Sequence, residues 1–185
     1  MKIVIAGAGP GGLATALALH TAGHEVQVYE QVQELRALGV GINLLPHAVG
    51  ILHRYGLADA LAEVAIDAQE YVFMNRFGQE ILADARGLAA GYAYPQYSIH
   101  RGDLQRVLLE AVSRSIGPAA IRTGAKVVRA ETIGDRARAT LADRAGNALG
   151  TVEADLVIAA DGIHSAIRAQ FNPDEGMPIW NGATM

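Results

Sequence analysis

Six consecutive residues near the start of the chain, Gly7-Ala-Gly-Pro-Gly-Gly12, constrain its fold more than any other segment. The β-branched residues 2–6 before them predict a buried strand, and the apolar residues 13–19 after them predict a helix. The alternating residues 25–30 predict a second strand, which completes a βαβ unit. Because a helix crosses between them, the two strands are parallel. The sequence therefore predicts an α/β protein with a parallel sheet.

The glycines of this segment match the spacing G-x-G-x-x-G at Gly7, Gly9 and Gly12. The first permits a tight turn, the second lets the backbone approach a pyrophosphate, and the third allows close packing of helix on strand. Unpaired N–H groups and the helix dipole favour an anion there. Glu30 follows 18 residues after Gly12, where a carboxylate can accept hydrogen bonds from a ribose. The pattern predicts binding of NAD or FAD; the alternatives are a purely structural turn and a solvated Glu30.

Composition excludes several other classes of protein. A chain of 185 residues with 51% hydrophobic and 18% charged residues is not expected to be disordered. The net charge of −4 argues against nucleic acid and anionic membranes as partners. The longest apolar run, residues 156–160, is far shorter than the roughly 20 residues of a membrane span. The absence of cysteine excludes disulfides and thiol chemistry and fits a cytoplasmic protein.

No metal site is predicted from the histidines. His20 and His24 are four residues apart, but Gly23 interrupts the helix between them, and no His-Glu-x-x-His pattern occurs.

The rest of the chain alternates helical and strand patterns. The ranges that predict helices are 46–64, broken at Gly56, and 102–116. The ranges that predict strands are 70–75 and 80–84 as a hairpin, and 126–132, 136–141 and 151–154 as an antiparallel meander. Residues 156–160 are entirely apolar, which predicts a central parallel strand.

Residues 155–168, Asp-Leu-Val-Ile-Ala-Ala-Asp-Gly-Ile-His-Ser-Ala-Ile-Arg, resemble the second signature of the class A flavoprotein aromatic hydroxylases. Residues 39–44 resemble the family's segment around the isoalloxazine ring. Residues 99–104 resemble the segment with the family's arginine, on the helix after the hairpin. With the glycine pattern, the resemblance covers essentially all 185 residues. The segments most similar to the phenazine-1-carboxylate hydroxylase branch are 38–43, 93–101 and 160–166.

The resemblance implies which residues contact FAD. Gly7, Gly9 and Gly12 would hold the pyrophosphate, and Glu30 the adenosine ribose. Arg36 would lie near the ribityl–phosphate region.

Further contacts are implied for later segments. Gly41 would touch the flavin, and Arg101 and Gln105 would hydrogen-bond FAD from the start of their helix. Their spacing of four places both side chains on one helix face, although two polar residues on a solvated face would show the same spacing. Asp161 would serve the ribityl or pyrophosphate region, or make only a turn with Gly162.

His164 and Arg168 match positions linked to the nicotinamide nucleotide in relatives. No catalytic side chain is assigned, because in this family the cofactor carries the reactive oxygen. The resemblance implies an FAD-dependent monooxygenase in which NAD(P)H reduces the flavin, O2 forms a flavin C4a-hydroperoxide, and a small aromatic or heteroaromatic substrate is hydroxylated.

The expected fold is a Rossmann-like FAD-binding domain of the glutathione-reductase type, with a parallel sheet and an antiparallel β-meander, and the beginning of a β-sheet substrate domain. The FAD-binding domain would comprise residues 1–69 and 97–176, and the substrate domain would start with residues 70–96 and 177–185. The family's third signature, Gly-Asp, is expected beyond residue 185, so we interpret the chain as an N-terminal fragment. The alternatives are a non-catalytic nucleotide-binding fragment and an FAD-dependent reductase of related fold. No sequence feature predicts an oligomeric state.

Overall fold

The computed structural model describes residues 1–35, 40–176, 179 and 182. The chain forms two compact units, one made of residues 1–35 and 112–185 and the other of residues 36–111. Each unit contains its own sheets and is described by itself.

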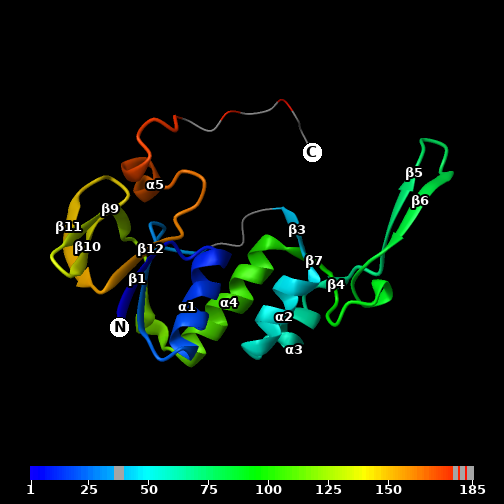
Figure 1. The fold of residues 1–185 in the computed structure, drawn as a ribbon, viewed down its shortest axis with the longest axis horizontal. Coiled ribbons are helices and arrows are strands. Elements are labelled where there is room, and N and C mark those ends of the chain that lie inside the picture. The colour runs from blue at the N-terminus through cyan, green and yellow to red at the C-terminus, as the bar shows by residue number, and fades with distance from the viewer. Residues whose placement is uncertain (36–39, 177–178, 180–181, 183–185) are drawn as a thin grey trace. The chain divides into compact units, whose positions relative to one another are not determined.

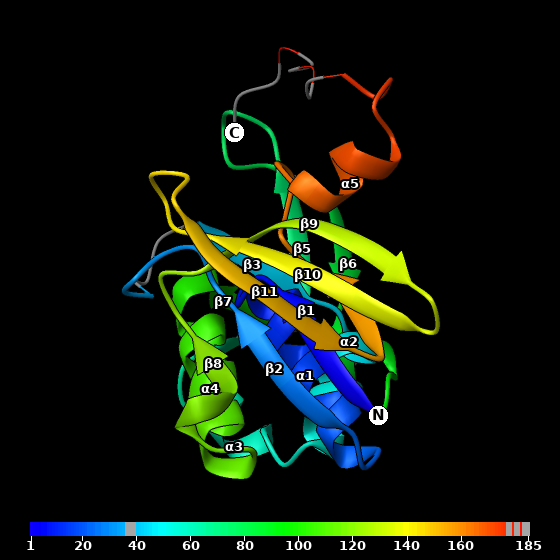
Figure 2. The same ribbon diagram turned by 90° about the vertical axis from the view of Figure 1, so that its left-hand side faces the viewer.

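The first unit is built on a parallel sheet with the strand order β12-β1-β2-β8. Figure 2 shows β1, β2 and β8 of this sheet. Its elements are β1 (Lys2–Ala6), α1 (Pro10–Thr21), β2 (Glu25–Tyr29), β8 (Ile121–Arg122) and β12 (Leu156–Ala159). The predicted βαβ unit is confirmed, since β1 and β2 are parallel and α1 packs on them. Leu13, Ala16 and Leu17 form the buried face of α1, at the spacing that a helix requires.

The interpretation of residues 156–160 as a central strand was wrong. Within the described residues, β12 lies at the edge of the sheet and pairs with β1 alone. Its two end residues are exposed and its two middle residues are partly buried, whereas Ile3 to Ala6 of β1 are buried. A short apolar run shows that a strand is suited to burial, but it does not show how many neighbours the strand has.

An antiparallel meander packs against this sheet, as predicted. It consists of β9 (Lys126–Ile133), β10 (Arg136–Ala142) and β11 (Ala148–Ala154), in the order β11-β10-β9. The buried side chains that join sheet and meander into one core include Val4, Ala6, Tyr29, Val127 and Leu141. The short helix α5 (Ala166–Phe171), which the sequence patterns did not predict, packs beside β9 (Figure 1). A 3-10 turn, η2 (Pro118–Ala120), precedes β8.

The second unit combines a three-stranded antiparallel sheet, of order β3-β7-β4, with helices. Its elements are β3 (Gly41–Leu44), α2 (Pro46–Arg54), α3 (Ala58–Ala62), β4 (Ile66–Asp67), β5 (Glu70–Met74), β6 (Glu80–Ala85), η1 (Gly87–Ala90), β7 (Tyr97–His100) and most of α4 (Arg101–Ser115). The break at Gly56 between α2 and α3 is confirmed; this glycine has a φ of 74°. Strands β3, β4 and β7 are too short and too mixed in composition to have been predicted.

The hairpin β5–β6 extends away from the helices of its unit (Figure 1). Large apolar side chains are exposed on both of its faces, including Phe73, Leu82 and Ile81. At its base, the side-chain nitrogen Nε2 of the buried Gln96 donates a hydrogen bond to the hydroxyl of Tyr71 over 2.6 Å. The hairpin is therefore anchored at one end, while its apolar side chains face solvent.

The predicted fold class is confirmed: a parallel sheet and an antiparallel meander form a mixed α/β unit. The domain boundaries stay a prediction. Within the described part of the chain, no helix has both the length and the apolar composition needed to cross a bilayer.

Candidate functional site

Three segments meet at one edge of the parallel sheet: the glycine turn after β1, Glu30 after β2, and the loop after β12. Strands β12, β1 and β2 are neighbours and run in the same direction, so their carboxyl ends lie together. The Gly7 N–H donates to the Tyr29 carbonyl oxygen over 2.7 Å, and the Ala160 N–H donates to the Ala6 carbonyl oxygen over 2.8 Å. Open α/β sheets bind their ligands at this edge.

The glycine turn excludes side chains at two positions and leaves space at a third. A Cβ on Gly7, whose φ is 99°, would lie 2.4 Å from the Ala160 carbonyl oxygen. A Cβ on Gly12 would lie 2.0 Å from the Gly7 carbonyl oxygen. A Cβ on Gly9 would meet no atom within 4 Å. The first and third glycines are therefore required for packing, whereas the backbone at Gly9 faces open space.

The open space at Gly9 adjoins the start of α1. Gly9 is the N-cap residue and no side chain caps the helix, while Pro10 supplies no N–H in the first turn. A helix of this length concentrates positive dipole charge at that end. The glycine turn thus fits a pyrophosphate held by backbone groups, as the sequence predicts.

Glu30 is buried beside this turn, with 9% of its surface exposed. Its Oε2 accepts a hydrogen bond from the Ala8 N–H over 2.8 Å, and its Oε1 accepts one from the Val32 N–H over 3.0 Å. A carboxylate offers about four lone-pair sites, so acceptor capacity is left for ribose hydroxyls. Glu30 therefore joins the glycine turn to the segment after β2, and it has the chemistry that ribose binding needs.

Asp161 turns the chain out of β12 and caps α5. Its Oδ1 accepts from the Ser165 hydroxyl over 2.6 Å, and its Oδ2 accepts from the Ala166 N–H over 2.9 Å. Ser165 is buried, and its Oγ accepts from the Arg168 N–H over 2.9 Å as the N-cap of the helix. Ser165 was not among the predicted site residues, although serine is a preferred N-cap residue.

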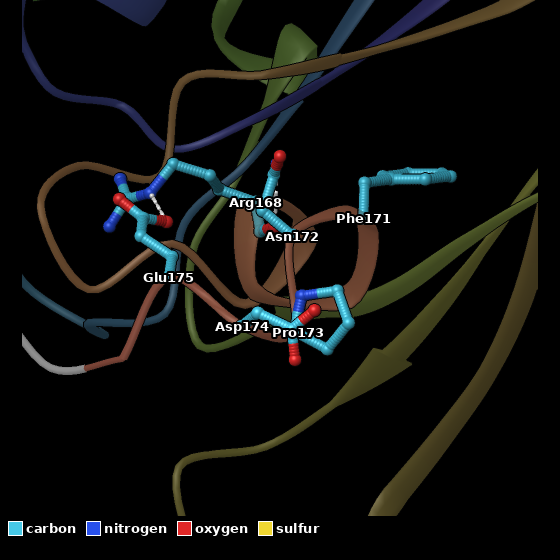
Figure 3. A pocket seen from close by; sticks show the side chains of 6 residues that line it. All are labelled: Arg168, Phe171, Asn172, Pro173, Asp174 and Glu175. Atoms are coloured by element: carbon cyan, nitrogen blue, oxygen red, sulfur yellow. Dashed lines mark hydrogen bonds and ion pairs between the residues drawn. The ribbon is translucent and has the colours of Figure 1, made fainter.

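Arg168 folds back over the same loop (Figure 3). Its Nε donates to Glu175 Oε2 over 2.7 Å, and its two terminal nitrogens donate to the carbonyl oxygens of Gly162 over 3.3 Å and Ile163 over 2.6 Å. His164 lies in this loop with an exposed side chain.

The remaining predicted site residues belong to the second unit. Gly41 pairs with His100 across β3 and β7, and the Arg101 N–H donates to the Val40 carbonyl oxygen over 3.1 Å. Gly41 and Arg101 are therefore brought together, with open space at the Cβ position of Gly41 and an exposed Arg101 side chain. Gln105 follows one helical turn later and is half-buried. Arg36 lies outside the described residues.

The described residues include no group of three or more His, Asp or Glu side chains placed to hold a metal ion.

A parallel βαβ unit with an open glycine turn, an acid after its second strand and a capped loop on the neighbouring strand defines a dinucleotide-binding α/β protein. Residues 1–178 match the family described as "FAD binding domain". The chain belongs to this family, so FAD rather than NAD is its cofactor.

Named relatives agree with this assignment. The phenazine 1,6-dicarboxylic acid hydroxylase PhzS of Lysobacter antibioticus is 46% identical over 191 residues, which cover 98% of this chain and 47% of the relative. The 3-hydroxybenzoate 6-hydroxylase 1 of Aquipseudomonas alcaligenes is 31% identical over 186 residues, which cover 99% of this chain and 45% of the relative. The chain spans less than half the length of these relatives.

A solved structure has a similar fold. HpxO of Klebsiella pneumoniae, in complex with FAD and uric acid, superimposes with a TM-score of 0.76 at 28% identity, over 92% of this chain and 41% of that one. The resemblance to FAD-dependent aromatic hydroxylases is therefore confirmed, while the roles of individual residues stay predictions.

Proposed function

We propose that the protein containing this chain is an FAD-dependent monooxygenase that hydroxylates a small aromatic or heteroaromatic compound, with O2 and NAD(P)H as co-substrates. The observation that carries the proposal is the open, uncapped glycine turn beside Glu30 and the Asp161 loop, in a chain that is 46% identical to a hydroxylase. Bound FAD would supply the transfer of electrons from NAD(P)H to oxygen.

The residues of the first unit would bind and orient the adenine half of the cofactor. The N–H groups at the start of α1 bind the pyrophosphate, with Gly9 allowing its close approach. Glu30 accepts hydrogen bonds from the adenosine ribose, and Asp161 shapes the loop near the ribityl and pyrophosphate groups. The exposed His164 contacts the nicotinamide nucleotide, and Arg168 acts on the same nucleotide through the loop that carries His164.

The residues of the second unit would serve the flavin half. Gly41 and Arg101 lie together at the start of α4, and Gln105 follows on the same helix. Arg101 and Gln105 donate hydrogen bonds to FAD, and Gly41 lets the flavin approach the backbone. Arg36 completes the set near the ribityl–phosphate region.

The substrate we propose is an aromatic acid. Several relatives are named for such compounds: phenazine 1,6-dicarboxylic acid, 3-amino-4-hydroxybenzoate, 3-hydroxybenzoate and 6-hydroxynicotinate. These compounds share an aromatic or heteroaromatic ring that carries a carboxylate. The proposed co-substrate NAD(P)H is a cytoplasmic metabolite, and we place the protein in that compartment.

We also propose that residues 70–96 and 177–185 begin a substrate-binding domain, whereas residues 1–69 and 97–176 form the FAD-binding domain. The hairpin β5–β6 supports this division because Phe73, Leu82 and Ile81 are exposed on it. An isolated two-stranded hairpin is at best marginally stable in water. Further strands of a longer chain would cover these side chains.

The test uses the purified full-length protein. We expect visible flavin absorbance, consumption of NAD(P)H and O2 that depends on an added aromatic acid, and a product heavier by one oxygen atom. A colourless protein that cannot be reconstituted with FAD would contradict the proposal. Substrate-independent NAD(P)H oxidation without a hydroxylated product would favour a reductase instead.

A further inference from the structure

The guanidinium of Arg168 is occupied by its own chain. Three of its five N–H donors point at Glu175, at the Gly162 carbonyl oxygen and at the Ile163 carbonyl oxygen, over 2.7, 3.3 and 2.6 Å. The two carbonyl oxygens belong to consecutive peptide units of the loop after β12. The planar fork of a guanidinium is suited to holding several acceptors at once, which an ammonium group does less well.

The other end of the same loop is fixed by Asp161, which accepts hydrogen bonds from Ser165 and Ala166. The loop is therefore held from both sides by groups of helix α5. Gly162, with a φ of 81°, supplies the backbone conformation that lets the chain fold back on this helix.

A displacement of this loop would reach the glycine turn. The position of a Cβ on Gly7 is 2.4 Å from the Ala160 carbonyl oxygen and 3.1 Å from the Asp161 Cα. The start of the loop thus packs directly on the turn that is proposed to bind the pyrophosphate.

The position of Glu175 limits what the Arg168 guanidinium can bind. Its carboxylate lies at Nε, one of the two sides from which a phosphate would approach a guanidinium (Figure 3). A bound anion would have to displace Glu175 or be repelled by it. The same carboxylate keeps the guanidinium over the loop carbonyls.

We infer that Arg168 is a positioning residue: its guanidinium holds the carbonyl oxygens of Gly162 and Ile163, Glu175 keeps the guanidinium in place, and the loop that carries Asp161 and His164 is thereby fixed beside the glycine turn. Glu175 thereby takes part in cofactor binding, and the functional readout of this role rests on the proposed FAD-dependent activity.

The test compares Glu175→Ala, Glu175→Gln and Arg168→Lys in the full-length protein. Glu175→Ala removes the acceptor at Nε, whereas Glu175→Gln keeps an acceptor oxygen and removes the charge. We expect Glu175→Ala and Arg168→Lys to raise the Kd for FAD by about three- to tenfold, the range that the net loss of one hydrogen bond gives. Glu175→Gln should restore most of the affinity, and the KM for NAD(P)H should not fall in any variant.

The matched control is Glu153→Ala, which removes the exposed Arg138–Glu153 ion pair, 2.8 Å long, from the meander. It should leave the Kd for FAD and the visible spectrum of the bound flavin unchanged.

If Arg168 instead contacted a phosphate of the nicotinamide nucleotide directly, the KM for NAD(P)H would change and the Kd for FAD would not. Removing the competing carboxylate by either Glu175 variant would then lower the KM for NAD(P)H and leave the Kd for FAD unchanged, which would overturn the inference. Unchanged values of both constants would overturn it as well.

Hydrogen exchange separates this inference from the proposed function. In FAD-free protein, residues 161–165 should exchange faster in Glu175→Ala and Arg168→Lys than in the wild type and in Glu153→Ala. Unchanged exchange there would refute the positioning role even in a protein that oxidises NAD(P)H. Faster exchange in a protein that hydroxylates no aromatic acid would instead refute the proposed function alone.

Discussion

The carboxylate of Glu30 accepts a hydrogen bond from the Ala8 N–H over 2.8 Å, so the acid after β2 is attached to the glycine turn after β1. The same carboxylate accepts from the Val32 N–H over 3.0 Å. The residue expected to bind ribose therefore also fixes the backbone that is expected to bind pyrophosphate. We therefore expect a substitution of Glu30 to change both the affinity for FAD and the local order of the turn.

Glu30→Gln tests this expectation. The glutamine amide retains one oxygen acceptor, but its NH2 group would face the N–H of Ala8 or Val32, where it cannot accept. We expect a loss of about 1–3 kcal/mol in the free energy of unfolding, the cost of an unsatisfied buried donor, and at least about tenfold weaker binding of FAD. Urea unfolding and flavin fluorescence titration measure the two effects.

Glu25→Gln is the matched control, because Glu25 lies at the exposed start of the same strand and the charge change is identical. Wild-type FAD affinity in Glu30→Gln would show that the acid contributes neither to the turn nor to the ribose site.

Two glycines of the turn should respond differently to alanine. In Gly12→Ala, the new methyl group would lie 2.0 Å from the Gly7 carbonyl oxygen, so helix α1 must shift. We expect a loss of at least about 2 kcal/mol in the free energy of unfolding, within the range that overpacking causes.

Gly9→Ala should separate binding from stability. Gly9 has a φ of −69° and open space at its Cβ position, so alanine fits the apoprotein and changes its stability by about 1 kcal/mol or less. The methyl group would nevertheless occupy the space that a pyrophosphate needs, and FAD should bind at least about tenfold more weakly. Thermal unfolding and FAD titration of both variants give the comparison; equal FAD affinity in Gly9→Ala and wild type would exclude Gly9 as the point of closest approach.

The sequence predicted the βαβ unit well because its signals are local: a β-branched run, glycines at a fixed spacing, and an acid at the end of a strand. It did not predict the pairing of Gly41 with His100, because contacts between distant short strands depend on tertiary packing. The two carbonyl oxygens that Arg168 binds could not be predicted from the sequence either, because they belong to a loop whose path depends on the conformation of Gly162. A five-residue apolar run likewise could not show that β12 lies at a sheet edge among the described residues.

Ser165→Ala should destabilise α5 through the loss of two hydrogen bonds. The serine hydroxyl donates to Asp161 and accepts from the Arg168 N–H. Loss of an N-cap costs about 0.5–2 kcal/mol, and the buried position of Ser165 favours the upper part of that range. Chemical denaturation measures the change. Ser113→Ala, a serine within α4, is the control, and an equal effect of both substitutions would argue against a capping role for Ser165.

The stability of the first unit should fall in acid through Asp155. A hydrogen bond from the Lys2 backbone N–H and the nearby charge of Arg136 hold the pKa of this carboxyl below its ordinary value. Since the folded pKa is lower than the unfolded one, the stabilisation is present above the unfolded pKa, and it is lost as the pH falls from about 4 through the folded pKa. In Asp155→Asn this contribution is absent at every pH, so the difference in unfolding free energy between variant and wild type should shrink below about pH 4. Urea unfolding between pH 3 and pH 7 measures the difference, with Asp135→Asn, in the exposed turn between β9 and β10, as the control. A difference that stays constant over this range would show that the Asp155 carboxylate does not stabilise the fold through its charge.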